Sequence, residues 1–428
     1  MYNILIITYY WPPSGGSGVQ RWLYFSKYLK KMGCNPIVLT VNPKNASYGI
    51  FDSTLSNHVK DIETHLTSSF EILKLYSFFK SGNQMSNIPQ SYIPNKTLFD
   101  KLTSFIRLNF FIPDSRIGWN YFAIRKAEKI IKNNKIDCVI TTGPPHSSHL
   151  IGHNLIKKFK LKWIVDLRDP WSEIFYLKKK FRFNFSRKIN SKLESKVLET
   201  SDAIITTVGK RYHDILREKI SNPKKIYKIY NGYDKSNYDQ IKEHKPEKFN
   251  IVFTGVLTEN HCYDIFDKVL VVLKTQYRDL NIILTTAGNI DKNIKRLFSS
   301  NIKHIDRGYV NHDEAIEIIK SSHLLINFNY NETEQTDMIS GKLIEYLASG
   351  SPIINFSNNA TESEILLKKS KDSFNANYRD IDKVVQFIIS KYNEWSKGNF
   401  IKRVPEDIRS LSRENLTQKL FDLICRVV

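Results

Sequence analysis

Short apolar runs alternate with amphipathic stretches along most of the chain. The first apolar run, at 3–8, leads into a glycine-containing loop, after which Trp22, Phe25 and Leu29 recur at helical spacing. Further runs of strand length in the first half lie at 138–142, 161–166 and 202–208. This alternation is typical of an α/β protein with parallel sheets. The segment 45–110 is too irregular for an element to be placed in it.

The second half repeats this alternation after a break. An Asn231-Gly232 turn precedes a polar stretch at 233–248, which we interpret as a linker between two domains. The strands expected beyond it lie at 249–255, 281–288, 302–308, 323–329 and 352–356, and the helices at about 262–277, 312–321 and 341–349. The pattern predicts two doubly wound, Rossmann-like domains at 1–232 and 249–404. Because ligands of such sheets bind at the carboxyl ends of the strands, we expect the domains to face a central cleft that holds the site.

The composition is that of a folded protein. A length of 428 residues suits two domains, and 41% hydrophobic with 25% charged residues excludes a disordered or fibrous chain. The cysteines lie far apart, without the spacing of a metal site or a disulfide framework, which favours a reducing cytoplasm. They are Cys34, Cys138, Cys262 and Cys425. No apolar stretch reaches the roughly 18 residues of a membrane span, and the N-terminal run lacks the features of a signal peptide, so we expect any membrane contact to be peripheral.

Glycines gather directly after the first expected strand. Gly15, Gly16 and Gly18 would let the backbone approach a ligand closely, and the N-terminus of the following helix attracts anions. Their spacing is neither the GxGxxG of dinucleotide-binding proteins nor that of a Walker loop, since no Lys-Ser/Thr follows. A tight connecting turn explains the cluster equally well.

Two loops of the first half each follow a buried strand and should therefore lie at the same edge of the sheet. The loop at 141–149 contains His146, and the loop at 166–171 contains Arg168 and Asp169. These side chains could bind hydroxyls or phosphate, or transfer a proton. Taken alone they favour a structural interpretation, in which Asp169 caps a helix, Arg168 pairs with it and His146 is a solvated loop residue.

A helix is predicted within the stretch 337–350. Leu343 and Leu347 are spaced to pack on one face, which leaves Lys342 and Glu345 nearer the other side. A carboxylate there can accept hydrogen bonds from vicinal hydroxyls such as those of a ribose, and Lys342 with the amides at the helix start suits a diphosphate. The alternative is an ordinary amphipathic helix with a surface carboxylate.

The sequence GKLIEYLASGSPII, with Asp337 eight residues ahead of Glu345, resembles the nucleotide-sugar signature of GT-B glycosyltransferases, especially of the retaining family-4 type. Other segments fall in the order found in bacterial surface-polysaccharide glycosyltransferases. They are YYWPPSGGSGVQR, PDSRIGW, TTGPPHSSHLIG, DLRDPW, NGYD, FTG and RGYVNHDEAI. The resemblance covers nearly the whole chain. It implies a first domain that binds the acceptor, a second that binds the sugar donor, and a C-terminal helix at about 405–428 that packs back on the first domain.

The resemblance also implies roles for individual residues. Glu345 would hold the donor ribose, Lys342 would lie near the diphosphate, and His146 would face the transferred sugar. Glycines near the donor phosphate, residues flanking the nucleobase and further positions in matching motifs complete the expected donor site. These are Gly15, Gly16, Gly18, Gly255, Tyr309, Val310, Gly341 and Leu343.

The sequence departs from the family pattern at two places. Asp337 stands where the family has a glutamate, and the usual Arg and Lys pair is missing from the segment GVLTENHCYD at 255–264. The cation that neutralises the leaving phosphate is therefore open. Arg21, Arg168 and Lys342 are the candidates.

An excess of basic residues points to an anionic partner. The chain has 64 Lys and Arg against 43 Asp and Glu, a net charge of +21. Part of this charge lies at 176–196, where basic residues interleave with phenylalanines. Such a mixture suits an anionic bilayer, on which each basic residue contributes about 1 kcal/mol. Single-stranded nucleic acid, or a solvated charged face over half-buried aromatic residues, is an alternative explanation.

These features together predict a glycosyltransferase of bacterial cell-surface polysaccharide synthesis, whether of lipopolysaccharide, capsule or exopolysaccharide. It would move a sugar from a UDP- or GDP-linked donor to a glycan or lipid-linked acceptor at the inner face of the cell membrane. The resemblance to family 4 implies retention of configuration. We expect no metal or further cofactor, because no Asp-x-Asp pair stands where it would hold a catalytic metal. His146 would shape the sugar site and Asp169 would contact the acceptor. The alternatives are a sugar-nucleotide epimerase on the same fold and, ranked low, a basic nucleic-acid-binding protein.

Overall fold

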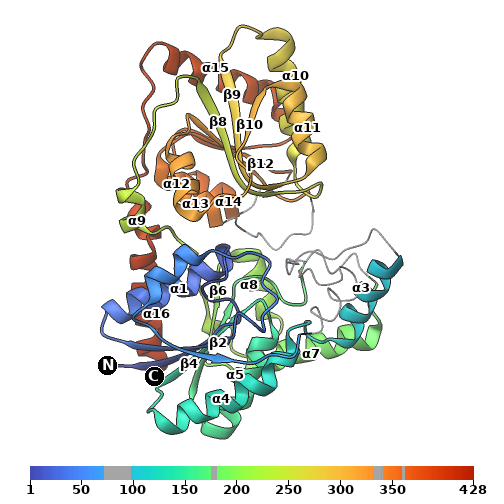
Figure 1. Cartoon of the computed structure of the whole chain (residues 1–428), viewed down its shortest axis with the longest axis vertical. Helices are drawn as coiled ribbons and strands as arrows, with labels where there is room; N and C mark the ends of the chain where they lie inside the picture. Colours follow the sequence, from blue (N-terminus) through green and yellow to red (C-terminus); the bar gives the residue numbers. More distant parts are fainter. Residues whose placement is uncertain (72–97, 175–180, 332–338, 340, 359–361) are drawn as a thin grey trace. The chain divides into compact units, whose positions relative to one another are not determined.

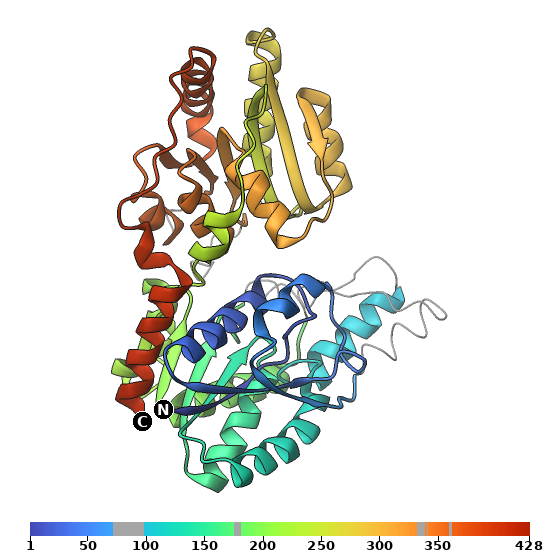
Figure 2. The ribbon, with the colours of Figure 1, turned by 60° about the vertical axis from the view of Figure 1, so that its left-hand side comes forward.

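The chain forms two compact units, each with its own parallel sheet. The computed structural model describes residues 1–71, 98–174, 181–331, 339, 341–358 and 362–428. Unit 1 comprises 1–230 and 416–428, and unit 2 comprises 231–415. In each unit helices lie on both faces of the sheet (Figures 1 and 2), which confirms the expected α/β class with two Rossmann-like domains. Within the described part of the chain, no helix is both long and apolar enough to span a membrane.

Unit 1 contains a seven-stranded sheet in the order β3-β2-β1-β4-β5-β6-β7, in which all neighbouring strands are parallel. Its strands are β1 (Asn3–Ile7), β2 (Asn35–Val41), β3 (Glu63–Thr67), β4 (Cys138–Gly143), β5 (Lys162–Leu167), β6 (Ala203–Thr206) and β7 (Ile226–Lys228). Its helices are α1 (Ser17–Lys31), α3 (Leu98–Phe110), α4 (Asn120–Asn133), α5 (Ser147–Phe159), α7 (Asn184–Thr200), α8 (Lys210–Arg217) and most of α16 (Arg413–Val427). The strand order reverses between β1 and β4. Such a switch point opens a ligand crevice at the carboxyl ends of the strands.

Unit 2 repeats this architecture with six parallel strands in the order β10-β9-β8-β11-β12-β13. Its strands are β8 (Phe249–Leu257), β9 (Ile282–Ile290), β10 (Lys303–Asp306), β11 (Leu324–Phe328), β12 (Ile353–Phe356) and β13 (Ser373–Ala376). Its helices are α9 (Lys235–Gln240), α10 (Tyr263–Gln276), α11 (Lys292–Asn301), α12 (His312–Lys320), α13 (Gly341–Ser349), α14 (Glu362–Leu367) and α15 (Ile381–Ser396). Here the order reverses between β8 and β11.

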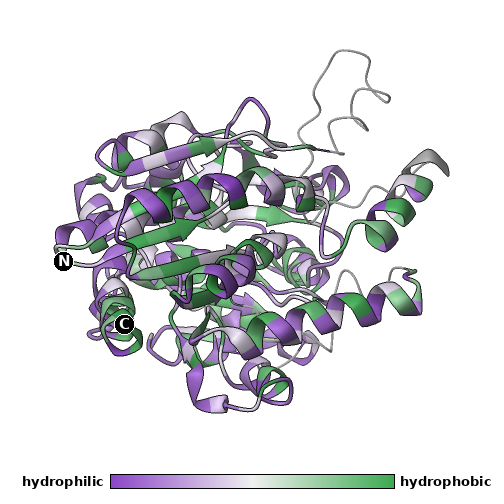
Figure 3. Ribbon diagram, turned by 90° about the horizontal axis from the view of Figure 1, so that it is seen from below, coloured by the Kyte–Doolittle hydropathy of each residue, from purple (hydrophilic) through white to green (hydrophobic). Residues whose placement is uncertain are grey.

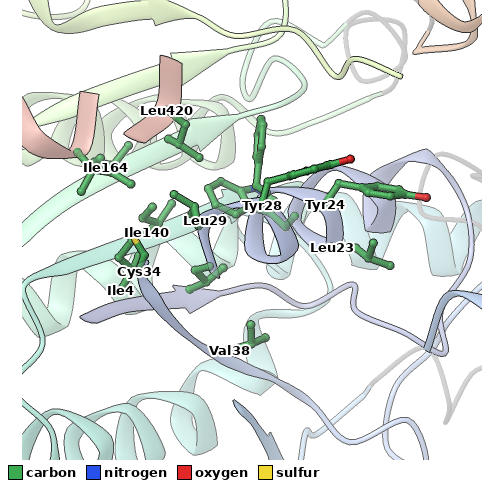
Figure 4. Close-up of a cluster of buried hydrophobic side chains, with 14 of the residues drawn as sticks. Ile4, Leu23, Tyr24, Tyr28, Leu29, Cys34, Val38, Ile140, Ile164 and Leu420 are labelled. Carbon is green, nitrogen blue, oxygen red and sulfur yellow. The ribbon is translucent and has the colours of Figure 1, made fainter. Parts of the chain in front are cut away.

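The last helix of the chain packs into the core of unit 1. Leu416, Leu420, Leu423 and Ile424 recur on one face of α16 and are buried with residues of α1, β1, β4 and β5. Figure 4 shows Leu420 in the same cluster as Leu29 and Ile164. Burial of this apolar stripe holds the end of the chain on unit 1.

An aromatic cluster fills the core of unit 2. Phe253 of β8 and Phe328 of β11 lie 5.2 Å apart between ring centroids, and Phe328 lies 5.3 Å from Phe356 of β12. Phe266 of α10 contacts Phe328 and Phe356 at 5.9 and 5.5 Å. The first strand after the unit boundary is thereby fixed in the core, up to the point where its carboxyl end meets α13.

Candidate functional site

In unit 1, a buried aspartate joins the elements at the carboxyl ends of β1, β4 and β5, which we call the unit 1 edge. Asp166 of β5 accepts hydrogen bonds from Arg21 Nη2 at 2.8 Å, Trp22 Nε1 at 2.6 Å and Thr142 Oγ1 at 2.9 Å. Arg21 Nε also donates to Asp166, and Nη1 donates to the carbonyl of Ile229 at 3.0 Å. All three guanidinium nitrogens of Arg21 are thus bonded within the fold, and the residue is only 1% exposed. This geometry argues against the expected contact between Arg21 and a donor phosphate.

Arg168 holds the loops of the unit 1 edge together. Its Nη1 donates to the carbonyl of Gly18 at 2.9 Å, its Nη2 to that of Pro144 at 3.2 Å, and its own carbonyl accepts from Thr207 Oγ1 at 2.7 Å. Its Nε lies 4.0 Å from the Asp169 carboxylate, and its side chain is 12% exposed. Arg168 therefore acts first as a positioning residue that spans the loops after β1, β4 and β5.

The glycine loop after β1 has structural requirements of its own. Gly16 has φ +91°, which L side chains rarely adopt. A Cβ at Gly18 would lie 2.7 Å from Nη1 of Arg168, so only glycine leaves room for that guanidinium. The amide of Gly15 donates to the carbonyl of Ile50 at 2.9 Å. These contacts favour the turn interpretation of the cluster and fix the loop in place.

His146 lies just before α5 and is stacked on Trp171. The ring centroids are 5.0 Å apart and the planes differ by 7°. Burial, with a smaller contribution from His149, holds the pKa of His146 well below its usual value, so the imidazole is neutral at pH 7. Its Nδ1 is buried and has no hydrogen-bond partner among the described residues. Burial also raises the pKa of the Asp169 carboxyl.

His149 adds a second neutral imidazole that the sequence interpretation missed. Thr141 Oγ1 accepts a hydrogen bond from Trp163 Nε1 at 3.0 Å and is also hydrogen-bonded to His149 Nδ1 at 2.9 Å. A Cβ at Gly143 would lie 2.5 Å from His149 Nε2 and 2.8 Å from His146 Nδ1, so both nitrogens border the space over Gly143. The repeat of histidine at i and i+3 in PPHSSH is a sequence signal for this pair.

In unit 2, the carboxyl ends of β8 and β9 and the start of α13 form what we call the unit 2 edge. Lys342 donates to the Thr254 carbonyl at 2.9 Å, and its ammonium lies 3.9 Å from the centre of the Phe253 ring. Burial lowers its pKa to about 7. Among the described residues no carboxylate lies within 4.0 Å of this ammonium. Lys342 is thus a half-buried side chain whose Nζ contacts a carbonyl oxygen and the face of an aromatic ring.

A pair of glycines makes room beside Lys342. Gly255 and Gly288 are opposite one another in β8 and β9, and a Cβ at Gly288 would lie 2.1 Å from the Gly255 carbonyl oxygen. Gly255 has φ +115°, and a Cβ there would lie 3.1 Å from Lys342 Nζ. Gly288 thus allows the close approach of β9 to β8, and Gly255 leaves room for the Lys342 ammonium at a half-buried stretch of backbone.

Glu345 lies one turn further along α13. Its Oε1 is 3.7 Å from His312 Nε2 and 3.7 Å from Arg413 Nη2, and its backbone carbonyl accepts from the Tyr238 hydroxyl at 2.7 Å. Burial raises the pKa of Glu345 to about 7, although Arg413 opposes this shift. The sequence interpretation missed His312 and Arg413, because both stand far from Glu345 along the chain and belong to no motif with it.

His261 occupies the segment in which the family's Arg and Lys pair is missing. It is 5% exposed and stacks on Tyr330 with ring centroids 4.1 Å apart. Thr258 bonds to its Nδ1 through the backbone amide at 3.1 Å. Burial, and more weakly the charge of Lys342, lower its pKa to about 4. The neutral imidazole of His261 thus lies close enough to Lys342 for the lysine charge to affect its pKa.

The remaining expected donor residues differ in exposure. Tyr309 is 56% exposed and Val310 half-buried, in the loop that follows β10. Gly341 begins α13, whereas Leu343 is fully buried, so its side chain serves packing and only its backbone could face a ligand. Asp337 lies outside the described residues. Over the ranges that the structure describes, no cluster of three or more His, Cys, Asp or Glu is placed to hold a metal ion.

Comparison with known proteins supports the fold. No protein-family model matches the chain, and no curated protein matches it in sequence. Sucrose-phosphate synthase from Thermosynechococcus elongatus is similar in structure, with a TM-score of 0.61 and 13% identity over 100% of this chain and 99% of that one. HepE from Anabaena, solved with UDP-glucose, has a TM-score of 0.62 and 10% identity over 100% of both chains. A TarM variant from S. aureus, solved with UDP and α-GlcNAc-glycerol, has a TM-score of 0.57 and 11% identity over 99% of this chain and 100% of that one. At these identities the likeness establishes the GT-B fold.

Proposed function

We propose that the chain is a glycosyltransferase that uses a nucleotide-diphosphate sugar as its donor. The observation that carries this proposal is Lys342, a half-buried amine at the N-terminal turn of a helix, whose pKa desolvation lowers to about 7. A diphosphate placed against it would supply the missing counter-charge and would also accept bonds from the helix amides. The fold shared with HepE and TarM, both solved with UDP or a UDP-sugar, supports the same choice of ligand.

The donor ribose is assigned to Glu345. A carboxylate can accept hydrogen bonds from two vicinal hydroxyls at once, and Arg413 and His312 hold Oε1 from the protein side. The exposed Tyr309 and the neighbouring Val310 would flank the nucleobase. With Gly255, Gly341 and the backbone of Leu343, these residues make up the proposed donor site of unit 2.

The acceptor is assigned to unit 1. His146 is neutral at pH 7 and has an unused ring nitrogen, so it suits a hydrogen bond to a sugar hydroxyl better than the role of a strong base. Asp169 would contact the acceptor, and Arg168 would position both loops. We propose that transfer retains configuration and needs no metal, with the leaving diphosphate stabilised by Lys342 and helix amides.

The proposed acceptor is a glycan or lipid-linked glycan of a bacterial cell-surface polysaccharide. An acceptor attached to lipid lies at a membrane, so the proposal includes peripheral binding to the inner face of the cell membrane through the segment 176–196. The high net charge supports an anionic surface as the partner.

Thermal unfolding with a panel of UDP- and GDP-sugars tests the donor assignment. A cognate donor at a hundred times its dissociation constant should stabilise the protein by about 2.7 kcal/mol. Glu345→Gln should lose most of this stabilisation, whereas Glu364→Gln on α14, paired with Lys368, should leave it unchanged. Unchanged stabilisation in Glu345→Gln would refute the ribose assignment. Conversion of a donor alone into an isomeric sugar nucleotide would establish an epimerase instead.

A further inference from the structure

Two helices of unit 1 carry apolar side chains on their exposed faces. In α3, Leu102, Ile106 and Phe110 follow one another at intervals of four residues, so they line one face of the helix. Phe185 and Ile189 have the same spacing at the start of α7, and Phe181 lies just before it. All six side chains are between 39 and 67% exposed. Figure 3 shows both helices reaching out on the same side of the unit, with hydrophobic residues along each.

The two helices are fastened to each other where these faces meet. Phe105 of α3 stacks on Phe181 at 6.0 Å and meets Phe183 edge-on at 5.3 Å. Asn109 Oδ1 accepts from the Phe183 amide at 2.6 Å, and the Asn109 carbonyl accepts from Ser186 Oγ at 2.9 Å. The exposed residues are thus presented by a fixed two-helix element and not by a single loose segment.

Basic residues surround the apolar faces. Lys101 lies beside Leu102 on α3, and Lys188 and Lys192 continue along α7 beyond Phe185. All three lysines are exposed. Asp100 stands beside Lys101 in the sequence of α3, and its side chain lies outside the described residues. On α7 the acids are Glu194, which is buried against Lys219 at 2.9 Å, and Glu199 at the far end of the helix. Around the apolar faces, basic residues therefore outnumber acidic ones.

We propose that α3 and the start of α7 form a membrane-insertion element, which buries the six exposed apolar side chains in an anionic phospholipid bilayer while the lysines contact its phosphates. An apolar face rimmed with lysine fits the boundary between acyl chains and anionic headgroups. A second copy of the chain would bring like charges together, and aliphatic side chains such as Leu102 and Ile106 offer nothing for nucleobases to stack on. This inference deepens the proposed function, because it names the surface that would hold the enzyme where a lipid-linked acceptor lies.

Co-sedimentation of the full chain with vesicles tests the element without any sugar nucleotide. The unmodified chain should bind vesicles of phosphatidylcholine with phosphatidylglycerol and bind poorly to phosphatidylcholine alone. Replacement of Leu102, Ile106 and Phe110 by serine should weaken binding about tenfold or more, since three apolar side chains no longer insert. Lys188→Gln with Lys192→Gln should weaken it about thirtyfold in low salt.

Matched controls distinguish membrane insertion from non-specific hydrophobic binding and from misfolding. Leu66→Ser with Tyr121→Ser removes two equally exposed apolar side chains from β3 and α4 and should leave binding unchanged. A Phe185→Trp variant should show a larger blue shift of emission on anionic vesicles than the unmodified chain, whose six tryptophans give the background, and the difference reports entry of position 185 into the bilayer. Donor-induced thermal stabilisation is measured in parallel. Its loss indicates loss of the fold or failure of the proposed donor site, whereas loss of vesicle binding alone indicates failure of membrane binding.

Three results would overturn the inference. Equal vesicle binding by the serine variant and the control would exclude α3 as an insertion element. A change in mass of the serine variant in light scattering, with vesicle binding intact, would assign the faces to contact between copies. Binding of a single-stranded oligonucleotide in place of vesicles would assign the lysines to nucleic acid.

Discussion

The two sheets of this protein share the order of their first six strands, yet the charged residues at their carboxyl ends have different partners. At the unit 1 edge Arg21 and Asp166 neutralise each other at 2.8 Å in a fully buried pair. At the unit 2 edge the half-buried Lys342 contacts a carbonyl and an aromatic ring, and Glu345 Oε1 lies 3.7 Å from Arg413 Nη2 and from His312 Nε2. The first arrangement neutralises both charges within the fold, whereas the second is the one to which the proposed function assigns a ligand.

This difference separates residues that look alike in the sequence. Arg21 and Lys342 both follow a glycine-containing stretch near a helix start, and both qualified as the cation for a diphosphate. Their exposure differs, because Arg21 is only 1% exposed whereas Lys342 is half-buried. Their partners differ too: Arg21 pairs with Asp166, and no carboxylate of the described residues lies within 4.0 Å of the Lys342 ammonium. This contrast favours a structural role for Arg21, and ligand binding by Lys342 stays a proposal.

The largest effect is expected from breaking the buried pair of unit 1. Asp166→Asn should lower the free energy of unfolding by about 3–5 kcal/mol, because Arg21 would remain buried without a counter-charge. Calorimetry of the variant measures the change. The control is Glu128→Gln, which removes the partly exposed partner of Lys158 and should cost less than about 1 kcal/mol. Equal losses in the two variants would mean that the pair does not organise the edge.

The next largest effect is expected in unit 2, from removal of the charged group of Lys342. Lys342→Met should weaken UDP binding by about 2–4 kcal/mol, or roughly thirtyfold to a thousandfold, since the diphosphate loses its charged donor. Stability should fall by no more than about 1 kcal/mol, because the change removes a desolvated charge without exposing a partner. Isothermal titration and calorimetry measure the two quantities. Lys274→Met on α10 is the control and should alter neither; a large loss of stability in Lys342→Met would make Lys342 a structural residue like Arg21.

The pH dependence of donor binding sharpens the comparison further. An anion favours the charged form of Lys342, so UDP affinity should fall as pH rises above about 7, approaching tenfold per unit. Glu345 accepts ribose hydroxyls best when ionised, so affinity should also fall below about pH 7. Titrations across this range should therefore give a maximum near neutrality.

Two variants isolate the limbs of that profile. Lys342→Arg stays charged and should remove the alkaline limb, while Glu345→Gln should remove the acid limb. Above pH 7 the contribution of Lys342 to the free energy of unfolding should change in the opposite direction to UDP affinity. The pKa of Lys342 is lower in the folded than in the unfolded chain, so the folded state binds fewer protons between pH 7 and its ordinary pKa, and the contribution of this group to stability rises with pH there. An alkaline limb that survives in Lys342→Arg would assign the titration to another group.

The sequence predicted the inner strands well and the outer elements poorly, for a physical reason. The strand β1, NILII, is buried over its last four residues, which are all apolar, whereas the edge strand β3, ETHLT, is mostly polar or exposed and carries no such signal. The helix α3 was missed within 45–110 because its exposed face is apolar too, which obscures helical periodicity.

The residues of the candidate site were likewise predicted only in part from the sequence. Lys342 and Glu345 were predicted because both belong to one helix and one motif, and the roles of these two residues stay predictions until a donor is bound. His312 and Arg413 reach Glu345 only through the packing of α12 and the start of α16, which no local pattern encodes. The ion pair between Arg21 and Asp166 likewise depends on pairing between β4 and β5 and on the position of α1, so it forms only in the folded chain.

The smallest effect is expected at the loop after β10, where the proposed donor site meets solvent. Tyr309 is more than half exposed, so stacking on a nucleobase would bury one face of its ring and contribute about 0.5–1.5 kcal/mol. Tyr309→Ala should therefore raise the dissociation constant of UDP roughly twofold to tenfold and leave that of pyrophosphate unchanged, because pyrophosphate has no base to stack. Lys342→Met should weaken both ligands alike. A loss for pyrophosphate in Tyr309→Ala as large as for UDP would move Tyr309 from the base to the phosphates, and with it the orientation of the donor along the unit 2 edge.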